Sequence, residues 1–324
     1  FEQLVASYQA GRGHHALLIQ ARGGMGADSL AYAITRFLMC QNPDGHKSCG
    51  QCHSCQLMQA GTHPDYYVLQ PEKGKSTLGI DAVRETSEKL YEHSRLGGAK
   101  VVWIADAALL TEAAANALLK TLEEPPKNTW FFLACEEPAR LLATLRSRCR
   151  FYHLAPPNEA YALAWLEREI SQPRETLLTA LRLCDHAPAA ALDLLAADTW
   201  GAREKLCQAL SATLNSGDWL ALLPSLNHDS AVARLHWLSS LLLDALKHQQ
   251  RITRLTNVDS VDLVNRLANA LSASRLQAIA ADACTCREQL LSVTGLNREL
   301  ILTERLLRWE QYLQPGAVLP VSHL

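Results

Sequence analysis

The sequence predicts an α/β domain built on a parallel sheet, followed by an all-α region. Three observations predict it. Short apolar runs of β type alternate with amphipathic stretches in the first half of the chain, these runs stop after residues 155–157, and helical periodicity continues from there. At 324 residues the chain has room for two or three domains. We expect an α/β domain at 1–157, a small helical domain at 158–197 and a larger helical domain at 198–324.

Five apolar runs have the length and composition of strands. They lie at 15–20, 65–69, 100–104, 130–134 and 151–154. Between the first two runs, Leu30, Ile34 and Phe37 share one face of a helix. Between the third and fourth, a helical stretch at 111–124 is closed by two prolines. Strands joined by crossover helices predict a parallel sheet.

After residue 157 the pattern is that of one helix after another. Three short helices are expected at 158–170, 175–184 and 188–196. Two longer apolar stripes follow at helical spacing, and they consist of Leu235, Leu238, Leu242 and Ala245, and of Leu302, Leu306, Trp309 and Leu313. No fixed-period repeat occurs, so a solenoid is disfavoured.

The chain has no net positive charge that would attract nucleic acid. Lys and Arg number 31 against 33 Asp and Glu, a formal charge of -2. Any DNA contact must therefore be local or shared with partners. No apolar run approaches the roughly 18 residues that span a bilayer, and no basic segment leads into an apolar one at the start, so we expect a cytoplasmic protein. Because the chain opens with Phe1 and not Met, we also expect native residues before Phe1.

A glycine-rich turn connects the first strand to the first amphipathic helix. The turn contains Gly23, Gly24 and Gly26, and a strand, a glycine-rich turn and a helix in succession are the context that a phosphate-binding loop requires. Read against Gly-x-x-x-x-Gly-Lys-Ser/Thr, the first glycine position is Ala21, the last is Gly26, the lysine position is Ala27 and the hydroxyl position is Asp28. A carboxylate there repels phosphate, so we interpret the segment as a degenerate phosphate loop that binds no nucleotide. An ordinary glycine turn and a working nucleotide site are the alternatives.

The acidic position that holds magnesium in nucleotide sites is also altered. The strand at 100–104 is followed by Ala105, where the magnesium-holding aspartate would be expected, and only Asp106 remains one position later. The two changes together predict that this chain does not hydrolyse ATP.

Four cysteines have the spacing of metal ligands. Cys40, Cys49, Cys52 and Cys55 follow the pattern C-x8-C-x2-C-x2-C. Two residues between thiolates let them converge on tetrahedral zinc, and four cysteine ligands leave no open position for water, so the zinc would be structural. An iron-sulfur cluster and free cytosolic thiols are the alternatives.

Arginines cluster beside the last predicted strand. Arg146, Arg148 and Arg150 alternate with Ser147 and Cys149, and no carboxylate interrupts them. Such a cluster favours a nearby anion, and the alternative is a solvated basic edge.

These motifs taken together resemble the AAA+ clamp-loader family. The resemblance rests on the degenerate phosphate loop, the cysteine cluster after its helix, the segment NALLKTLEEPP at 116–126, and Ser147, Arg148 and Cys149. It covers roughly residues 1–197. Beyond that, the segment SVTGLNREL at 292–300 and the helical pattern resemble the collar domain of that family. The resemblance implies an AAA+-type sheet domain with a zinc module at 40–55, a helical lid, and a helical collar for oligomerisation.

The resemblance also implies a role for Arg148. In clamp loaders the arginine of the Ser-Arg-Cys motif projects into the ATP site of a neighbouring subunit, as an arginine finger acting in trans. Arg148 is that arginine here, and Ser147 and Cys149 support the motif. The implied partners are gamma or tau ATPase subunits and a delta subunit, and, through the complex, the sliding clamp and primer-template DNA. The implied cofactor is structural zinc, with no ATP bound by this chain, which would be a non-ATPase stator subunit of a DNA polymerase holoenzyme.

Departures from the hydrolysing members of the family support this assignment. Such members carry Lys and Thr at the positions of Ala27 and Asp28 and an Asp-Glu pair near 105–106. The short helix near 188–191 lacks the arginine with which they sense nucleotide. A clamp-opening delta subunit would lack the Ser-Arg-Cys motif and the cysteine module.

Two other functions are alternatives. An independent replication or repair ATPase is disfavoured by Ala27 and Asp28, and measurable ATP affinity of the isolated chain would favour it. A zinc-dependent nucleic-acid-binding module would need basic and aromatic residues around the cysteines, but 41–59 contains only Lys47 as a basic residue and no aromatic one.

Overall fold

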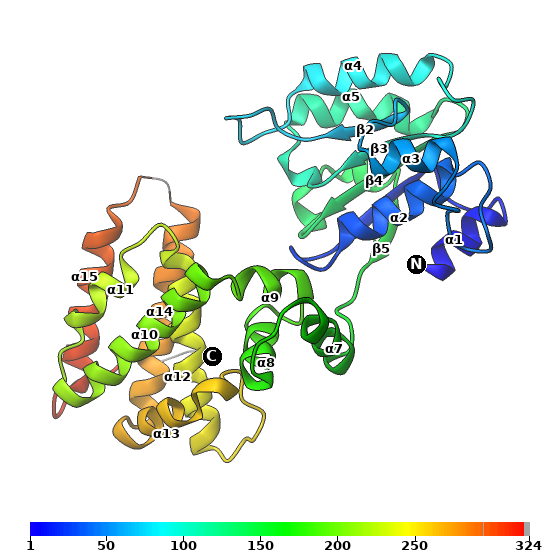
Figure 1. Cartoon of the computed structure of the whole chain (residues 1–324). Coiled ribbons are helices and arrows are strands. Elements are labelled where there is room, and N and C mark those ends of the chain that lie inside the picture. The colour runs from blue at the N-terminus through cyan, green and yellow to red at the C-terminus, as the bar shows by residue number, and fades with distance from the viewer. Residues whose placement is uncertain (294, 321–324) are drawn as a thin grey trace. The chain divides into compact units, whose positions relative to one another are not determined.

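The computed structural model describes residues 1–293 and 295–320. The chain divides into two compact units, Phe1–Pro156 and Pro157–Leu324. The first is an α/β unit and the second is helical (Figure 1). The predicted fold class, a parallel α/β domain followed by helical domains, is confirmed.

The first unit contains a five-stranded sheet in the order β2-β3-β4-β1-β5, and every neighbouring pair is parallel. The strands are β1 Ala16–Gln20, β2 Tyr66–Leu69, β3 Lys100–Ile104, β4 Thr129–Cys135 and β5 Arg150–His153. The two strands β1 and β3 are almost wholly buried, as expected for a parallel sheet covered on both faces. Since β1 and β3 run in the same direction, the loops that follow them leave the same edge of the sheet.

Helices cover both faces of the sheet. They are α1 Glu2–Gln9, α2 Ala27–Met39, α3 His53–Gln59, α4 Ile80–Tyr91, α5 Glu112–Glu123 and α6 Ala143–Arg146, with short 3-10 turns η1 Ala107–Leu109 and η2 Pro138–Arg140. Leu18 faces a core that includes α4 and α5, whereas Leu17 and Ile19 face a second core that includes α1, α2 and α3 (Figure 1). This alternation along β1 is the period-two pattern of a strand.

The second unit is helical throughout its described residues. Its elements are α7 Glu159–Glu169, α8 Arg174–Leu183, α9 Pro188–Leu194, α10 Ala197–Ser216, η3 Leu220–Leu222, α11 Leu223–Leu226, α12 Ala231–Gln249, η4 Val258–Ser260, α13 Val261–Ala270, α14 Ala273–Ser292 and α15 Arg298–Leu313. Helices occupy the three short segments predicted above, and both predicted stripes face the core. The segment 292–300 connects α14 to α15, and its Thr294 lies outside the described residues.

A buried polar network joins α7–α9 to the helices that follow. The Arg203 side chain is 1% exposed, and its Nη1 lies 2.6 Å from Asp259 Oδ2. Thr179 Oγ1 on α8 donates to Asp259 Oδ1 at 3.0 Å. One hydrophobic core also runs from Ala162 to Trp309. The lid and the C-terminal helices therefore pack as one unit, and the expected boundary at 197–198 stays a prediction.

No helix among residues 1–293 and 295–320 is both long enough and apolar enough to span a membrane.

Candidate functional site

The glycine-rich turn leads from β1 directly into α2. Gly24 and Gly26 have φ values of 77° and 84°, a left-handed conformation that suits glycine, and Gly26 is the N-cap of α2. The turn is closed by hydrogen bonds from Met25 N to Arg22 O and from Leu30 N to Gly26 O, at 3.2 and 2.9 Å. The N-terminus of α2, which is the positive end of its helix dipole, therefore lies at the edge of the sheet after β1. Phosphate sites use a helix N-terminus in such a place.

Ala27 and Asp28 occupy the lysine and hydroxyl positions of the loop. Ala27 begins α2 and Asp28 is exposed in its first turn. The Asp28 carboxylate complements the helix dipole itself, in the place of an anionic ligand. Ala105 follows β3 and offers no ligand, while Asp106 Oδ1 accepts a hydrogen bond from Ala108 N at 2.9 Å and caps η1. The acidic residue next to the expected magnesium position therefore stabilises a turn.

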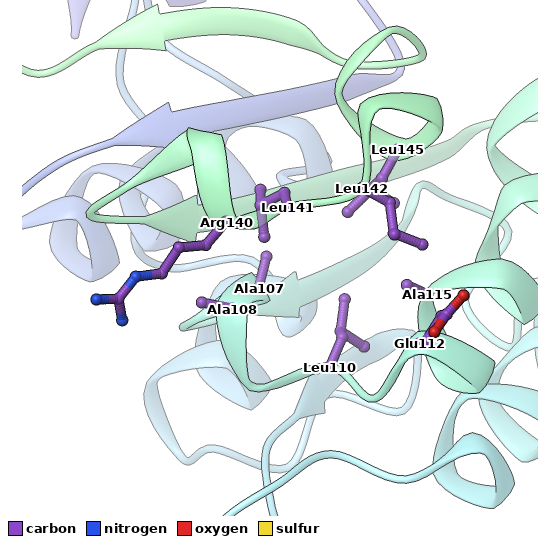
Figure 2. A pocket seen from close by; sticks show the side chains of 9 residues that line it. All are labelled: Ala107, Ala108, Leu110, Glu112, Ala115, Arg140, Leu141, Leu142 and Leu145. Atoms are coloured by element: carbon purple, nitrogen blue, oxygen red, sulfur yellow. The ribbon is translucent and has the colours of Figure 1, made fainter. Parts of the chain in front are cut away.

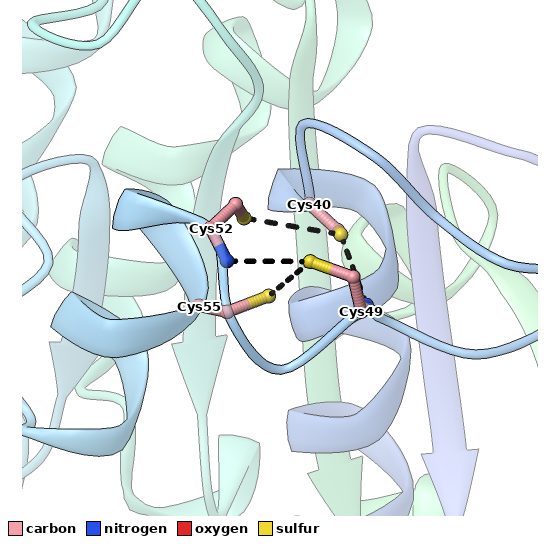
Figure 3. A group of neighbouring side chains, drawn as sticks. All are labelled: Cys40, Cys49, Cys52 and Cys55. Atoms are coloured by element: carbon pink, nitrogen blue, oxygen red, sulfur yellow. Dashed lines mark hydrogen bonds between the residues drawn. The ribbon is translucent and has the colours of Figure 1, made fainter.

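The four cysteines come together where α2 ends and α3 begins. Cys40 is the C-cap of α2, Cys52 is the N-cap of α3, Cys55 lies inside α3, and Cys49 lies in the loop between the helices (Figure 3). Their sulfur atoms all lie within 4.8 Å of one another. Left-handed Gly50, with a φ of 75°, lets the chain turn between Cys49 and Cys52.

The sulfur geometry fits a tetrahedral metal ion. The pairs Cys40–Cys52 and Cys49–Cys55 each have their sulfurs 4.0 Å apart. Four thiolates about 2.3 Å from one zinc ion would lie about 3.8 Å from one another. Backbone N–H groups also donate to sulfur, from Cys49 to Cys40 at 3.2 Å and from Cys52 to Cys49 at 3.3 Å. Such donors support thiolate charge.

The thiols differ in acidity. Burial raises the pKa of Cys55 to about 12, with the Cys52 thiol adding to the effect. Burial also opposes ionisation of Cys52, but backbone N–H donors from Cys55 and Gln41 and the neighbouring thiols lower its pKa to about 6. A bound cation would displace the remaining protons from the cluster.

A buried hydrogen-bond chain anchors α3 to β2, and sequence reasoning missed it. His63 is 6% exposed and its Nε2 lies 2.9 Å from Ser54 Oγ, next to Cys55. Asp65 N donates to His63 Nδ1 at 3.2 Å, so the imidazole proton lies on Nε2 and is donated to Ser54. Burial lowers the pKa of His63, which keeps the ring neutral. The chain fixes one side of the cysteine module.

Arg148 lies between α6 and β5. Its Nε donates to Glu123 Oε1 at 2.7 Å, its Nη2 is paired with the same oxygen, and its Nη1 donates to the Thr144 carbonyl at 2.7 Å. The side chain is 29% exposed. Ser147 Oγ donates to the Thr144 carbonyl at 3.0 Å and closes the last turn of α6. The structure thus brings Arg148 and Ser147 together with Glu123, which sequence reasoning missed.

Cys149 has a packing position in this motif. It is partly buried against the core that contains α4 and α5. Burial, and then the nearby Cys135 thiol, raise the pKa of Cys149 to about 12. The neutral thiol packs as a small apolar residue.

A pocket of about 150 Å³ lies beside α6. Leu110, Leu141, Leu142 and Leu145 contribute side chains to it, while the Arg140 guanidinium extends away from them (Figure 2). The pocket separates η1 from the helix that leads into Arg148.

The chain is similar to curated proteins over its whole length. A curated relative from Escherichia coli (strain K12), DNA polymerase III subunit delta', is 68% identical over 324 residues, covering 100% of this chain and 97% of that protein. The chain belongs to the delta' subunit family of DNA polymerase III. The delta' subunit from Yersinia pestis is 54% identical over 98% of this chain and 95% of its own length.

Three family models match successive parts of this delta' subunit. The model described as "DNA polymerase III, delta subunit" matches residues 1–158. The model described as "DNA polymerase III subunit delta', AAA+ ATPase lid domain" matches 157–196. The model described as "DNA polymerase III, delta subunit, C terminal" matches 197–311. The delta' subunit thus has an AAA+ domain, a lid and a C-terminal helical domain.

Other relatives of this delta' subunit are more distant. DNA polymerase III subunit tau/gamma of Haemophilus influenzae is 31% identical over 159 residues, which is 49% of this chain and 23% of that protein. The crystal structure of a DNA polymerase III gamma subunit-related protein from Thermotoga maritima has a TM-score of 0.51 at 19% identity, covering 96% and 99% of the two chains. The second likeness shows the fold alone.

Proposed function

We propose that this delta' subunit works in the clamp loader without hydrolysing ATP, and that it supplies Arg148 in trans to the ATP site of a neighbouring gamma or tau subunit. Its own phosphate loop carries Asp28 where phosphate would bind. Its Asp106 is engaged in capping a turn. The Arg148 side chain in the same unit is 29% exposed. A partly exposed arginine, in a chain whose own phosphate loop carries a carboxylate, is the observation that carries the proposal.

The proposed partners follow from this arrangement. Gamma or tau subunits hold the ATP that Arg148 reaches, and a delta subunit belongs to the same complex. The sliding clamp and primer-template DNA are engaged through the assembly, because the formal charge of -2 gives this chain no basic field for DNA. We place the subunit in the cytoplasm with the replication machinery.

We further propose that Cys40, Cys49, Cys52 and Cys55 hold one structural zinc ion. The thiol donors and the sulfur spacing fit a tetrahedral site with four protein ligands. Bound zinc would crosslink the end of α2 to the start of α3. The ion supplies folding energy and no chemistry to the ATP site.

The decisive experiment compares clamp-loader ATPase, stimulated by clamp and primed DNA, in complexes containing either wild-type chain or Arg148→Ala. Arginine fingers contribute on the order of 1,000-fold in other phosphoryl-transfer enzymes, so a large loss is expected. Arg146→Ala is the matched control, because Arg146 is an exposed neighbour in the same motif. Assembly is checked by gel filtration. Wild-type turnover in an intact Arg148→Ala complex would overturn the proposal.

A titration of the isolated chain with ATP and magnesium tests the other half of the proposal. Repulsion by Asp28 predicts no saturable binding at micromolar ATP. Micromolar affinity would instead support an independent ATPase.

A further inference from the structure

We infer that Glu123 is a positioning residue that holds Arg148 in the orientation in which it meets phosphate. This inference rests on the proposed role of Arg148 as a finger acting in trans. It concerns the residue that fixes the guanidinium, which lies 25 positions away in the chain and on a different helix.

The contacts of Arg148 hold most of its guanidinium and leave one donor free. Nε and Nη2 both meet Glu123 Oε1, while Nη1 donates to the Thr144 carbonyl at 2.7 Å and, in a longer contact of 3.5 Å, to Ser147 Oγ. A guanidinium has five N–H donors, so the second hydrogen on Nη2 remains available. That donor can meet a phosphate oxygen, and Nη1 can exchange its long contact with Ser147 for a second one.

The carboxylate of Glu123 lies at the C-terminal end of α5, where a negative charge is unfavourable. It is the last residue of α5, and Glu124 follows as the C-cap. Carboxylates at a helix C-terminus meet the negative end of the helix dipole, at a cost of about 0.3 to 1 kcal/mol. The ion pair with Arg148 offsets that cost, but Glu123 is 49% exposed, and exposed pairs contribute only about 0 to 1 kcal/mol to stability. Stability of the fold alone gives Glu123 little reason to be acidic.

The two ends of the pair are attached to rigid elements. Leu118 and Leu122 fix α5 in the core at 1% exposure each, and Leu145 fixes α6 at 1%. A long arginine side chain loses about 2 kcal/mol of rotamer entropy when it is immobilised. Glu123 and Thr144 immobilise Arg148 before any neighbour arrives. The neighbouring phosphate then meets a side chain that is already oriented.

The test uses reconstituted complexes carrying Glu123→Gln, with Glu124→Gln as the matched control. Among the described residues Glu124 has no side-chain partner, so its substitution changes the same charge without touching Arg148. We expect Glu123→Gln to lower stimulated kcat by roughly tenfold, less than Arg148→Ala, with KM for ATP within about twofold of wild type. Glu123→Asp, which keeps the charge on a shorter side chain, should recover part of the turnover. Glu124→Gln should behave as wild type.

A double substitution separates positioning from a structural role. If Glu123 acts through Arg148, then Glu123→Gln in an Arg148→Ala background causes no further loss, whereas independent effects would multiply. The inference is overturned if the two substitutions together reduce turnover by the product of their single effects. It is also overturned if Glu123→Gln alone has wild-type or raised turnover. Either outcome leaves the finger role of Arg148 intact. Wild-type turnover in Arg148→Ala overturns both the finger and the role of Glu123.

Discussion

Arg148 illustrates what a sequence can and cannot reveal about a single side chain. Three arginines within five residues point to the cluster, but only the resemblance of Ser147, Arg148 and Cys149 to the Ser-Arg-Cys motif singles out Arg148. Its partner Glu123 was hidden, because the contact depends on how the end of α5 packs beside α6. The convergence of the four cysteines was easier to predict, since all four lie within 16 consecutive residues and have the spacing of metal ligands.

The shape of the arginine should matter as much as its charge. In Arg148→Lys a single ammonium replaces the planar fork, so it cannot bind Glu123 and a neighbour's phosphate along two edges at once. We expect Arg148→Lys to lose most of the stimulated ATPase that Arg148→Ala loses, measured in the reconstituted complex. Recovery to near wild-type turnover would show that positive charge alone suffices.

The elements themselves were largely predictable. All five strands lie within one residue of the predicted runs at each end, because apolar runs bounded by turn residues are a strong signal. The helices α1, α3 and α4 were not predicted. α4 buries only Val83 and Leu90, and α3 lies within the cysteine module, where metal spacing dominates the pattern. Their positions depend on the sheet that they cover.

The cysteine module should depend on its metal. We expect one zinc ion per chain by elemental analysis, and less than half of that content in Cys52→Ser, because three thiolates hold zinc more weakly than four. The melting temperature of the first unit should fall in parallel. Cys284→Ser is the control, since Cys284 is exposed and lies outside the cluster. Full metal content in Cys52→Ser would contradict the four-ligand site.

The lid should carry an acid-sensitive contact. Glu159 on α7 pairs with Arg182 on α8 through two bonds of 3.0 Å, and hydrogen bonding from Arg182 lowers the pKa of Glu159. A lowered folded-state pKa gives stability that is present above the unfolded value of about 4.3 and is lost as the pH falls through the folded value. In urea unfolding, wild type should therefore exceed Glu159→Gln in midpoint at pH 7, with the gap closing below about pH 4.

The control for this contact is Glu169→Gln, at the end of the same helix. The difference in urea midpoint between wild type and Glu169→Gln should stay constant across the same pH range. A gap between wild type and Glu159→Gln that is independent of pH would mean that the carboxylate charge is not what stabilises the contact.

At the scale of the whole molecule, the two units have separate cores. The sheet cores involve residues up to Leu154, and the helical core begins at Ala162. The sequence indicated the change in character after 155–157. It did not indicate that the lid would share the core of the C-terminal helices, because contacts such as Thr179 with Asp259 join residues 80 positions apart.

Calorimetry should resolve two transitions in the intact chain. A zinc chelator should lower only the one that belongs to Phe1–Pro156. Arg203→Met should lower only the other, with a loss of about 3 to 5 kcal/mol in the free energy of unfolding, because it leaves the partly buried Asp259 and the buried Asn257 without their cation. A single transition that both treatments shift equally would show one cooperative unit.

The shared core of the second unit also has a consequence for synthesis on the ribosome. The α/β unit is complete once its own residues have emerged, and it can fold at that point. The helices α7–α9 cannot, because Arg182 and Thr179 find their partners at Leu255 and Asp259, the latter 80 positions further on. At roughly 5 to 20 residues per second, the lid waits about 4 to 16 seconds with its apolar faces exposed. In that interval the nascent lid presents apolar surface that a chaperone could bind.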